Sequence, residues 1–351
     1  MKRGIIAMSG GVDSSVAALL MMQQGDVLQG VTLLLQSQAT DACGSGSDAD
    51  DAAKVCQKLG IPHESWDMRQ QFQQQVQDRF CACYRSGGTP NPCIDCNRYL
   101  KFGVMLERAL QRGWDYIASG HYARVMWDEA RKRWVLKKGL DESKDQSYVL
   151  YGLTQHQLAH LRLPLGELRK EQVRELAAQQ GFSSANRPES QDICFVPDGD
   201  YTAFLQRHTG KPLTPGKFVL AVDGRELGAH RGMEAYTIGQ RKGLGISWTE
   251  PLYVVDKCKE DNSVRLGSNR DLFRTELTAG DCNWIAVDAL AEPMRVTART
   301  RYHQTETPAT ISPLPDGGVE AIFDTPIRAI TPGQAVVFYQ DDLVVGGGTI
   351  R

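Results

Sequence analysis

The side chains best suited to covalent chemistry in this sequence are a close pair of cysteines. Cys93 and Cys96 follow Asn91 and Pro92 in the segment Thr-Pro-Asn-Pro-Cys-Ile-Asp-Cys-Asn-Arg. Asparagine is a favoured N-cap residue and proline suits the first helical position, so the segment predicts the start of a helix. Because residues three apart share one helix face, both thiols are expected side by side in the first turns.

Two basic residues follow this cysteine pair in the sequence. Arg98 and Lys101 follow within two turns, and together with the helix dipole they are expected to lower the pKa of a thiol there. A thiolate attacks sulfur or carbon and leaves readily, so the pattern favours sulfur transfer. Cys194 is a third candidate, since distance along the sequence does not prevent pairing in space. The six other cysteines show no such pattern and are expected to be buried or incidental: Cys43, Cys56, Cys81, Cys83, Cys258 and Cys282.

A phosphate-binding loop is predicted near the N-terminus. A short apolar run from Ile5 to Met8 precedes Ser-Gly-Gly-Val-Asp-Ser-Ser at Ser9 to Ser15, and a helical pattern follows. Glycines let backbone N–H groups approach a ligand, serine hydroxyls add donors, and a helix N-terminus attracts anions. Asp13 suits Mg²⁺ binding or N-capping. The sequence has no Gly-Lys-Ser/Thr ending there, so this is not the Walker-type loop of γ-phosphate transfer.

This loop resembles the pyrophosphatase loop of the N-type ATP pyrophosphatases. The resemblance implies cleavage of ATP between its α and β phosphates and adenylation of a carbonyl oxygen. Alone, the motif leaves several relatives open, namely GMP, asparagine and argininosuccinate synthetases, a tRNA lysidine synthetase and tRNA thiolases.

Alternating strand and helix patterns position this loop. Strands are expected at 5–8, 27–35 and within 114–121, and helices at 14–24 and 49–59. Such alternation predicts an α/β domain with a doubly wound parallel sheet, similar to the adenine nucleotide alpha hydrolases, with ligands at the carboxyl ends of its strands. Residues 36–51 are rich in Ser, Ala, Gly and Asp and are expected to form a flexible loop.

After about Thr209 the pattern changes to short alternating runs, which predict all-β structure. Examples are the runs at 217–220, 253–255, 264–266 and 335–339. We predict a catalytic domain at 1–208, a small central β domain at 209–277 and a barrel-like C-terminal β domain at 278–351, with boundaries near 207–215 and 275–280.

Bulk composition narrows the class of protein. The net charge of −2 does not indicate general coating of nucleic acid, although a local basic patch is compatible with it. No stretch has the apolar length of a membrane span, and the N-terminal apolar run is too short for a signal peptide. Nine irregularly spaced cysteines without an export signal predict a cytoplasmic protein in a reducing compartment.

The order of further motifs identifies a closer resemblance. The chain is similar to the tRNA-specific 2-thiouridylases, which make 2-thiouridine at the anticodon wobble position. The motifs keep the family's order over nearly the whole chain: Ala-Met-Ser-Gly-Gly-Val-Asp-Ser-Ser from Ala7, Thr-Pro-Asn-Pro from Thr89, Cys-Asn-Arg from Cys96, Gly-His-Tyr-Ala-Arg from Gly120, Lys-Asp-Gln-Ser-Tyr from Lys144, Glu-Ser-Gln-Asp-Ile-Cys-Phe from Glu189, Tyr-Thr-Ile-Gly-Gln-Arg-Lys-Gly-Leu-Gly from Tyr236 and Thr-Pro-Gly-Gln from Thr331.

The resemblance implies roles for individual residues. Cys96 would be the nucleophilic, resolving cysteine, and Cys194 would carry a persulfide. ATP would contact Ala7, Met8, Ser9, Gly10, Gly11, Val12, Asp13, Ser14, Leu33 and Gly120. Asn91, Pro92 and Cys93 would shape a pocket for a flipped-out uridine, whose C2 is otherwise inaccessible in the loop stack. The tRNA would contact His121, Lys144, Asp145, Gln146, Arg301, Tyr302 and Gln334, the last three from the C-terminal domain.

The resemblance also implies a reaction with its cofactors and partners. ATP, with Mg²⁺, adenylates the C2 oxygen and releases pyrophosphate. The Cys194 persulfide delivers sulfur directly or after Cys96 frees it as sulfide, AMP leaves, and a Cys96–Cys194 disulfide remains. The partners would be the anticodon stem-loop of tRNA and a persulfide sulfur-donor protein, with no membrane.

Cys93 departs from the family pattern, because many members carry an aspartate there as an acid or base. Cys93, Cys96 and Cys194 could instead ligate a [4Fe-4S] cluster with one open iron site. A Cys93–Cys96 disulfide and a zinc site are further alternatives.

Other interpretations stay open for the whole chain and for two segments. The chain could be a pyrophosphatase-loop enzyme that ligates or amidates a small molecule, or a non-catalytic RNA-binding or sulfur-carrier protein. Arg299 and Arg301 flank Thr300, so both are expected on one face of a strand, toward phosphates or solvent. The segment 236–245, with Arg241 and Lys242, fits a phosphate contact or a simple turn.

Overall fold

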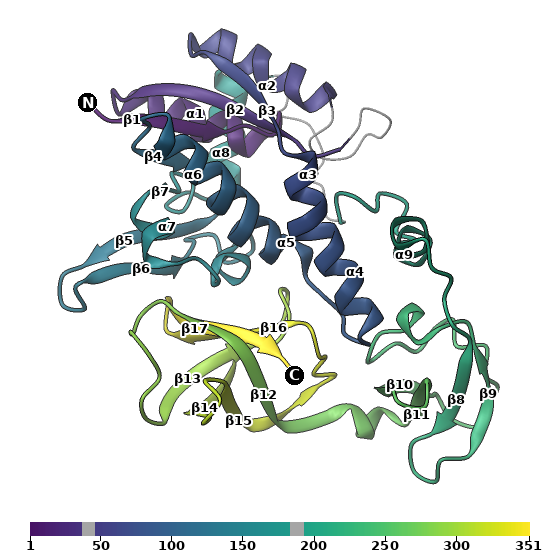
Figure 1. Ribbon diagram of the computed structural model, residues 1–351. Helices are drawn as coiled ribbons and strands as arrows, with labels where there is room; N and C mark the ends of the chain where they lie inside the picture. Colours follow the sequence, from purple (N-terminus) through teal and green to yellow (C-terminus); the bar gives the residue numbers. More distant parts are fainter. Residues whose placement is uncertain (37–45, 183–192) are drawn as a thin grey trace.

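The N-terminal part of the chain is a layered α/β domain. The computed structural model describes residues 1–36, 46–182 and 193–351. Five strands form a parallel sheet in the order β3-β2-β1-β4-β7 (Figure 1). They are β1 (Arg3–Ala7), β2 (Val27–Leu34), β3 (His63–Asp67), β4 (Tyr116–Ala118) and β7 (Leu161–Arg162). Since all neighbours run parallel, the carboxyl ends of these strands meet at one edge of the sheet.

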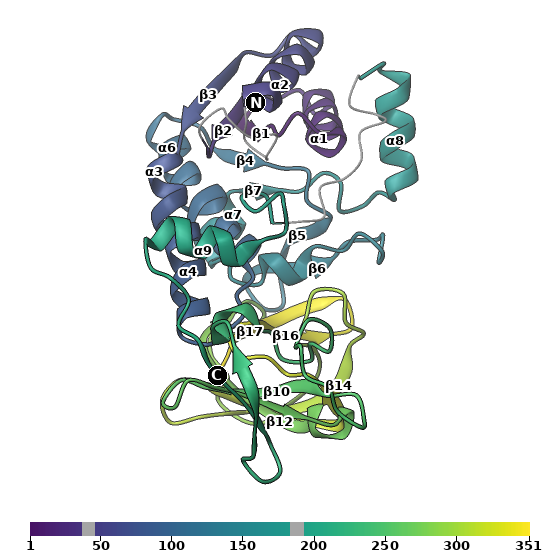
Figure 2. The ribbon, with the colours of Figure 1, turned by 90° about the vertical axis from the view of Figure 1, so that its right-hand side faces the viewer.

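Helices cover both faces of this sheet. On one face lie α1 (Val12–Gln23), α2 (Gly46–Leu59) and α8 (Lys170–Gln179), and Figure 2 shows α8 beside α1. Ile6 of β1 packs with the apolar residues of these helices, whereas its neighbour Ile5 packs with the opposite layer, because successive strand side chains point to opposite faces. The prediction of a doubly wound parallel sheet is confirmed.

Two long helices form the opposite layer. The first runs through α3 (Arg69–Phe72), the π-helical η1 (Gln73–Gln77) and α4 (Asp78–Arg85), and the second through α5 (Pro92–Asp95), the π-helical η2 (Cys96–Val104) and α6 (Met105–Gln111). We call the second one the cysteine helix. Its buried residues include Leu100, Phe102 and Leu106, which pack against Phe72 and Ile117. A wide turn of π type is uncommon and frequently marks a functional site.

A hairpin and a central β unit connect this domain to the barrel. The hairpin consists of β5 (Ala123–Asp128) and β6 (Arg133–Lys138), and the 3₁₀ turn η3 (Ser147–Leu150) and α7 (Gln155–Ala159) follow. The central unit begins with α9 (Tyr201–Thr209) and has a four-stranded sheet in the order β10-β11-β8-β9. Its elements are β8 (Gly216–Leu220), β9 (Glu226–His230), η5 (Met233–Ala235), β10 (Tyr253–Cys258), β11 (Ser263–Gly267) and η6 (Asn269–Leu272).

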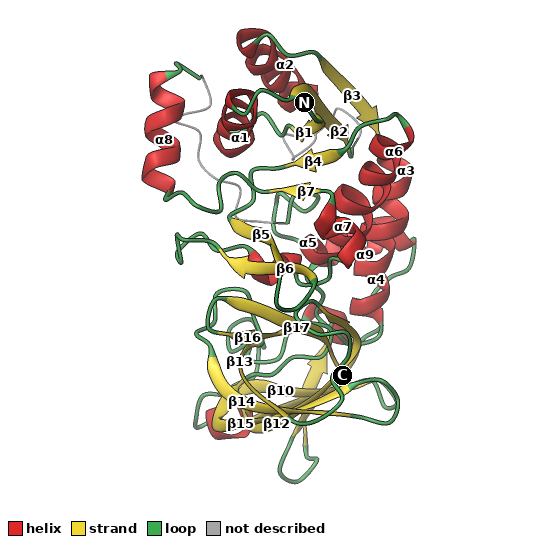
Figure 3. Cartoon of the chain, turned by 90° about the vertical axis from the view of Figure 1, so that its left-hand side faces the viewer, coloured by secondary structure: helices red, strands yellow, loops and turns green. Residues whose placement is uncertain are grey.

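The C-terminal part is a closed barrel. Its six strands are β12 (Phe273–Trp284), β13 (Met294–Arg299), β14 (Thr307–Pro313), β15 (Val319–Arg328), β16 (Ala335–Gln340) and β17 (Leu343–Ile350). Antiparallel pairing of β12 with β17 closes the barrel around residues such as Val296, Phe323 and Phe338. The hairpin β5–β6 continues this sheet, since Lys137 pairs with Leu343 of β17 (Figure 3).

The sequence placed most of these elements, with two differences. The predicted flexible loop at 36–51 is wrong for its last part, because α2 begins at Gly46; residues 37–45 lie outside the described residues. Residues 275–280, expected near a boundary, lie inside strand β12. In the described ranges, no helix is long and apolar enough to cross a membrane.

Candidate active site

The loop between β1 and α1 has the geometry of an anion cradle. Gly10 has a positive φ of 71°, and a Cβ there would lie 2.7 Å from the carbonyl oxygen of Asp48, so only glycine fits. Gly11 is the N-cap of α1 and has no side chain to cap the first helical N–H groups. These donors and the positive end of the helix dipole therefore face outward at the carboxyl end of β1.

The serine side chains of the loop mainly stabilise its shape. Ser14 and Ser15 donate from their hydroxyls to the carbonyl oxygen of Gly11 at 3.0 and 2.9 Å, and the N–H of Ser9 donates to Oγ of Ser14 at 3.2 Å. Ser15 is completely buried. The prediction that Ser15 adds a donor for phosphate is therefore wrong, whereas Ser9 stays exposed at the mouth of the loop.

Asp13 is held by two residues from other segments. Lys170, at the first position of α8, donates from Nζ to both carboxylate oxygens at 2.8 Å each, and the Tyr122 hydroxyl donates to Oδ1 at 2.7 Å. Asp13 does not cap its helix, so that alternative is wrong. Gly120 lies directly behind it, since a Cβ there would be 2.7 Å from the carbonyl carbon of Asp13. Gly120 is thus required for the close approach of the turn after β4 to the loop.

The other predicted ATP contacts lie in or next to β1, α1 and β2. Met8, Val12 and Leu33 have buried side chains, and Ala7 is partly buried at the end of β1. A nucleotide can therefore reach Met8 and Val12 mainly through their backbone.

The start of the cysteine helix agrees with the sequence. Asn91 is its N-cap, and its Oδ1 accepts from the N–H of Cys93 at 3.2 Å, with Pro92 at the first helical position. This prediction is confirmed. The barrel holds Thr89, two residues before the cap, because Thr89 donates its N–H to the Pro332 carbonyl at 2.8 Å and its own carbonyl accepts from Gln334 Nε2 at 2.8 Å.

The two thiols of the pair have different environments. Cys96 begins the π-helical segment and is buried in the hydrophobic cluster of this layer, whereas Cys93 is exposed. Neighbouring chain segments desolvate the Cys93 thiol and raise its pKa, although the charge of Lys101 acts in the opposite direction. The predicted lowering is therefore wrong for Cys93, which is a thiol rather than a thiolate at neutral pH.

Cys194 lies against the same hydrophobic cluster as Cys96. Its carbonyl oxygen accepts from Gln36 Nε2, just beyond β2, at 3.2 Å. The next residue, Phe195, packs edge-on against Phe72 and Phe80 of the first long helix. Cys96 and Cys194 therefore both pack in the large hydrophobic cluster on this side of the sheet, Cys96 inside it and Cys194 partly buried against it. The motif residues 189–192 lie outside the described residues.

The three candidate cluster ligands do not form a site for a single metal ion. Cys93, Cys96 and Cys194 all belong to the described residues, and among these no group of three or more His, Cys, Asp or Glu side chains is arranged to hold a metal ion. The described part of the chain thus shows no preformed site for a single zinc ion, while the [4Fe-4S] alternative stays a prediction.

His121 faces the cysteine helix. Its Nδ1 lies 2.8 Å from the Ser119 hydroxyl, and its ring meets Phe102 edge-on. Burial, with a further effect of the Lys101 charge, holds the pKa of His121 well below 6.5. At neutral pH the imidazole is uncharged. Lys101 acts on both His121 and Cys93, so all three share one electrostatic environment.

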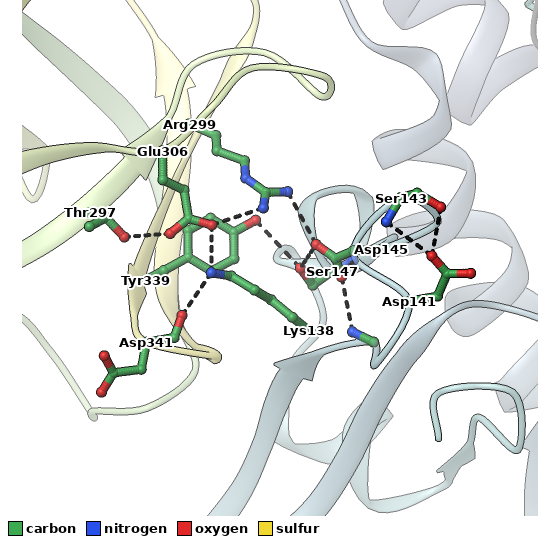
Figure 4. Close-up of polar contacts among 11 residues, drawn as sticks. Lys138, Asp141, Ser143, Asp145, Ser147, Thr297, Arg299, Glu306, Tyr339 and Asp341 are labelled. Atoms are coloured by element: carbon green, nitrogen blue, oxygen red, sulfur yellow. Dashed lines mark hydrogen bonds and ion pairs between the residues drawn. The ribbon is translucent and has the colours of Figure 1, made fainter. Parts of the chain in front are cut away.

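The residues predicted to contact tRNA are largely engaged between domains. Asp145 is buried: its carboxylate accepts from the N–H groups of Gly139 and Ser147, from the Ser147 hydroxyl and from Arg299 of the barrel (Figure 4). Gln146 accepts the N–H of Tyr122 at 2.9 Å. Lys144 is half-buried beside them.

Contacts within the protein occupy the two barrel arginines. Arg299 pairs with Asp145 and Glu306, and Arg301 donates to the carbonyl oxygens of Ile238 and Ala329 and to the Thr331 hydroxyl. The expectation that Arg299 faces phosphates or solvent is wrong, because Asp145 and Glu306 occupy its guanidinium. The tRNA contact of Arg301, which is partly exposed, stays a prediction. Tyr302 lies with its ring 5.9 Å from that of Tyr148, and Gln334 holds Thr89 as described.

Comparison with known proteins identifies the family. Residues 2–198 match the tRNA methyl transferase HUP domain, 202–268 the tRNA methyl transferase PRC-barrel domain and 274–350 the aminomethyltransferase beta-barrel domain. The tRNA-specific 2-thiouridylase MnmA of Acetivibrio thermocellus is 48% identical over 357 aligned positions, which cover 100% of this chain and 99% of that protein. This chain belongs to the tRNA-specific 2-thiouridylase family. The family member from Clostridioides difficile is 46% identical over 355 positions, with coverages of 100% and 98%.

Similarity to solved structures is weaker. The U34-tRNA thiolase NcsA from Methanococcus maripaludis with its [4Fe-4S] cluster is 17% identical with a TM-score of 0.36, and the match covers 59% of this chain and 66% of that one. A likeness of this size carries no argument about the site. The 2-thiouridylase family relation instead rests on full-length sequence identity.

Sequence reasoning missed two residues of the nucleotide loop's surroundings. Tyr122 lies inside the Gly-His-Tyr-Ala-Arg motif that begins at Gly120, so its position beside His121 is a usable signal. Lys170 follows no pattern in the sequence and meets Asp13 only because α8 packs against α1.

Proposed function

We propose that this protein is an ATP-dependent sulfurtransferase that adenylates C2 of the wobble uridine of tRNA and installs sulfur to form 2-thiouridine. The observation that carries the proposal is the combination of an anion cradle without a Walker lysine and two cysteines, Cys96 and Cys194, that pack in one hydrophobic cluster of the same domain. A small-molecule ligase or a non-catalytic RNA-binding protein would not need both.

The cradle binds the phosphates of ATP in this mechanism. The N–H groups of the first turn of α1 and of the Gly10–Gly11 turn bind the oxygens, and Leu33 and Gly120 border the nucleoside. Mg²⁺ accompanying ATP would screen the phosphate charge, while the Asp13 carboxylate is bonded to Lys170 and Tyr122. The uracil O2 attacks the α phosphorus, pyrophosphate leaves, and C2 becomes electrophilic.

Sulfur then replaces the adenylated oxygen. The terminal sulfur of a Cys194 persulfide bonds to C2, and the C2–O bond to AMP breaks. The Cys96 thiolate attacks the inner sulfur of Cys194, so that the S–S electron pair stays on the sulfur bonded to C2. The products are 2-thiouridine, AMP and a Cys96–Cys194 disulfide, which a two-electron thiol reductant must reduce before the next cycle.

The surroundings of the base are proposed to be electrically neutral except for one cation. Cys93 is protonated and His121 is uncharged at neutral pH, so neither repels a neutral uracil ring. Lys101 supplies positive charge in the same environment, where negative charge develops on O2 and then on sulfur. We assign Asn91 and Pro92 to the wall of the base pocket, and Lys144, Gln146, Arg301, Tyr302 and Gln334 to the surface that receives the anticodon stem-loop. The buried Asp145 supports this surface from inside, by joining its loop to Arg299 of the barrel.

The decisive experiment is thiolation of unmodified tRNA in vitro. The wild type and the variants Cys93→Ala, Cys96→Ala and Cys194→Ala are given ATP, Mg²⁺ and a persulfide-charged donor protein, and 2-thiouridine, AMP and pyrophosphate are quantified. We expect Cys96→Ala and Cys194→Ala to lose at least about 100-fold in rate, as nucleophile removal usually does. Sulfur transfer that survives Cys194→Ala contradicts the persulfide step.

The same assay separates the persulfide from an iron–sulfur mechanism. An anaerobic preparation without iron and without absorbance near 400 nm should be fully active if the persulfide carries sulfur. Activity that depends strictly on reconstitution with iron and sulfide would contradict the proposal.

A further inference from the structure

The ion pair between Lys170 and Asp13 is the most enclosed charged contact of the nucleotide loop. The Lys170 side chain is 7% exposed, and its ammonium lies 2.8 Å from both carboxylate oxygens of Asp13. The Tyr122 hydroxyl completes the carboxylate shell at 2.7 Å, and the ammonium lies 5.5 Å from the centre of the Tyr122 ring. The Lys170 ammonium is thus held directly against the Asp13 carboxylate.

Asp13 creates an electrostatic problem that this contact can solve. Asp13 stands in the first turn of α1, the place where a phosphate group would bind to the backbone N–H groups. A carboxylate charge at that position repels a polyanion, and in a partly buried loop the repulsion is only weakly screened. An uncompensated Asp13 would therefore oppose the binding that the loop is built for.

Backbone contacts hold Lys170 in place. Its N–H donates to Oδ2 of Asp141 at 2.9 Å, and α8 packs along α1 (Figure 2). The backbone of Asp13 is confined from behind by Gly120, where a Cβ would be 2.7 Å from its carbonyl carbon. Neither partner can move away from the other without displacing a helix or the turn after β4.

We propose that Lys170 is a positioning residue of the nucleotide loop, whose ammonium neutralises Asp13 and holds its carboxylate away from the phosphates of ATP. Lys170 acts through Asp13 and not by direct contact with the phosphates. The inference rests on the proposed function only in that the ligand of the loop is ATP, and it concerns ATP binding before any sulfur transfer.

The test is a set of nucleotide affinities measured by titration calorimetry without tRNA. In EDTA, Lys170→Met should weaken ATP binding on the order of 30-fold, because it leaves a partly buried carboxylate without its cation beside the ligand. Lys170→Arg, which keeps the charge, should stay within a few-fold of the wild type. The loss should be greatest for ATP, smaller for ADP and smallest for AMP, an order that general damage to the fold would not produce.

The most decisive measurement uses a double variant that removes the charges of both Asp13 and Lys170. The double variant Asp13→Asn/Lys170→Met should recover most of the lost ATP affinity in EDTA, and Asp13→Asn alone should bind ATP in EDTA at least as tightly as the wild type. Lys132→Met is the matched control, since it also breaks one lysine–carboxylate pair, but an exposed one in the β5–β6 turn, and should change nothing. Thermal melting of each variant verifies that it is folded.

Two outcomes overturn the proposal. Unchanged ATP affinity in Lys170→Met would show that Asp13 needs no compensation. A double variant as weak as Lys170→Met would show that the ammonium binds phosphate itself. Failure of the wild type to thiolate tRNA would contradict the proposed function but leave these nucleotide affinities interpretable.

Discussion

Arg299 of the barrel donates a hydrogen bond to the buried carboxylate of Asp145 at 3.1 Å. The second nitrogen of the same guanidinium donates to Glu306 at 2.8 Å, and Glu306 also lies 2.5 Å from Nζ of Lys138 in the β5–β6 hairpin (Figure 4). The loop that carries Asp145 continues into Gln146, which holds Tyr122 and thereby the surroundings of Asp13. The barrel and the nucleotide loop are thus joined by a continuous set of hydrogen bonds.

Replacing Arg299 should lower the stability of the fold, because the buried Asp145 carboxylate loses its cationic partner. We expect Arg299→Met to lower the free energy of unfolding by about 3 kcal/mol, because Asp145 keeps its negative charge without its cation. Urea unfolding monitored by far-UV circular dichroism measures this. Arg295→Met in the same barrel is the control: it breaks a pair with Asp324 that is about half exposed, and solvent screening should make its cost much smaller. Equal effects of the two variants would contradict the assignment.

The same interface should respond to acid. Burial opposes ionisation of Glu306, but hydrogen bonds from Lys138 and Thr297 outweigh it and hold its pKa below 4.5. A carboxylate with a lowered folded-state pKa stabilises the fold above the unfolded-state pKa, and this contribution is lost as pH falls through the folded-state value. Stability should therefore fall with decreasing pH below about 4.5, and Glu306→Gln should be less stable at pH 7 but lose less on acidification. Chemical denaturation at pH 7, 5, 4 and 3 tests this; parallel pH curves would contradict it.

Cys93 should react slowly with alkylating reagents despite its exposure. Desolvation raises its pKa above that of an ordinary thiol, so little thiolate is present at pH 7 and the rate should rise steeply only in alkaline solution. Lys101→Met should slow the reaction further, because the Lys101 charge lowers this pKa. Mass spectrometry of the Cys93 peptide after timed iodoacetamide treatment gives the rates. A plateau below pH 8 would contradict the raised pKa.

Features that are set by interactions between residues close in the sequence could be predicted, and features that are set by distant segments could not. The Asn91 cap and Pro92 need only their own helix turn, and the strand–helix alternation around Ser9 to Ser15 needs only periodicity, so both were predicted correctly. The pKa of Cys93 was not, because desolvation by neighbouring segments exceeds the dipole and the lysine. Arg299 and Arg301 read as surface residues, since period-two alternation does not reveal that a second domain covers the outer face of a strand.

The N-cap of the cysteine helix should affect both stability and chemistry. Asn91→Ala removes the acceptor for the Cys93 N–H and should cost about 1 kcal/mol of stability. Asn91→Asp keeps an acceptor at the same place and should retain the stability. Thermal melting distinguishes the two, and the thiolation assay should show a slower rate for Asn91→Ala because the helix start that carries Cys96 frays. A melting temperature unchanged by Asn91→Ala would contradict the role of the cap.

Gly120 offers a test of the close approach behind the nucleotide loop. In Gly120→Ala the added Cβ would lie 2.7 Å from the backbone of Asp13, which cannot yield without moving the first turn of α1. A displacement on the order of 1 Å at a binding loop costs roughly 100-fold in catalytic efficiency, so the apparent KM for ATP should rise and the rate should fall. Gly152→Ala is the control, because its Cβ meets only the flexible side chain of Arg98, at 3.2 Å. Steady-state pyrophosphate release at varied ATP measures both variants, and normal kinetics in Gly120→Ala would show that the turn after β4 can retreat from the loop.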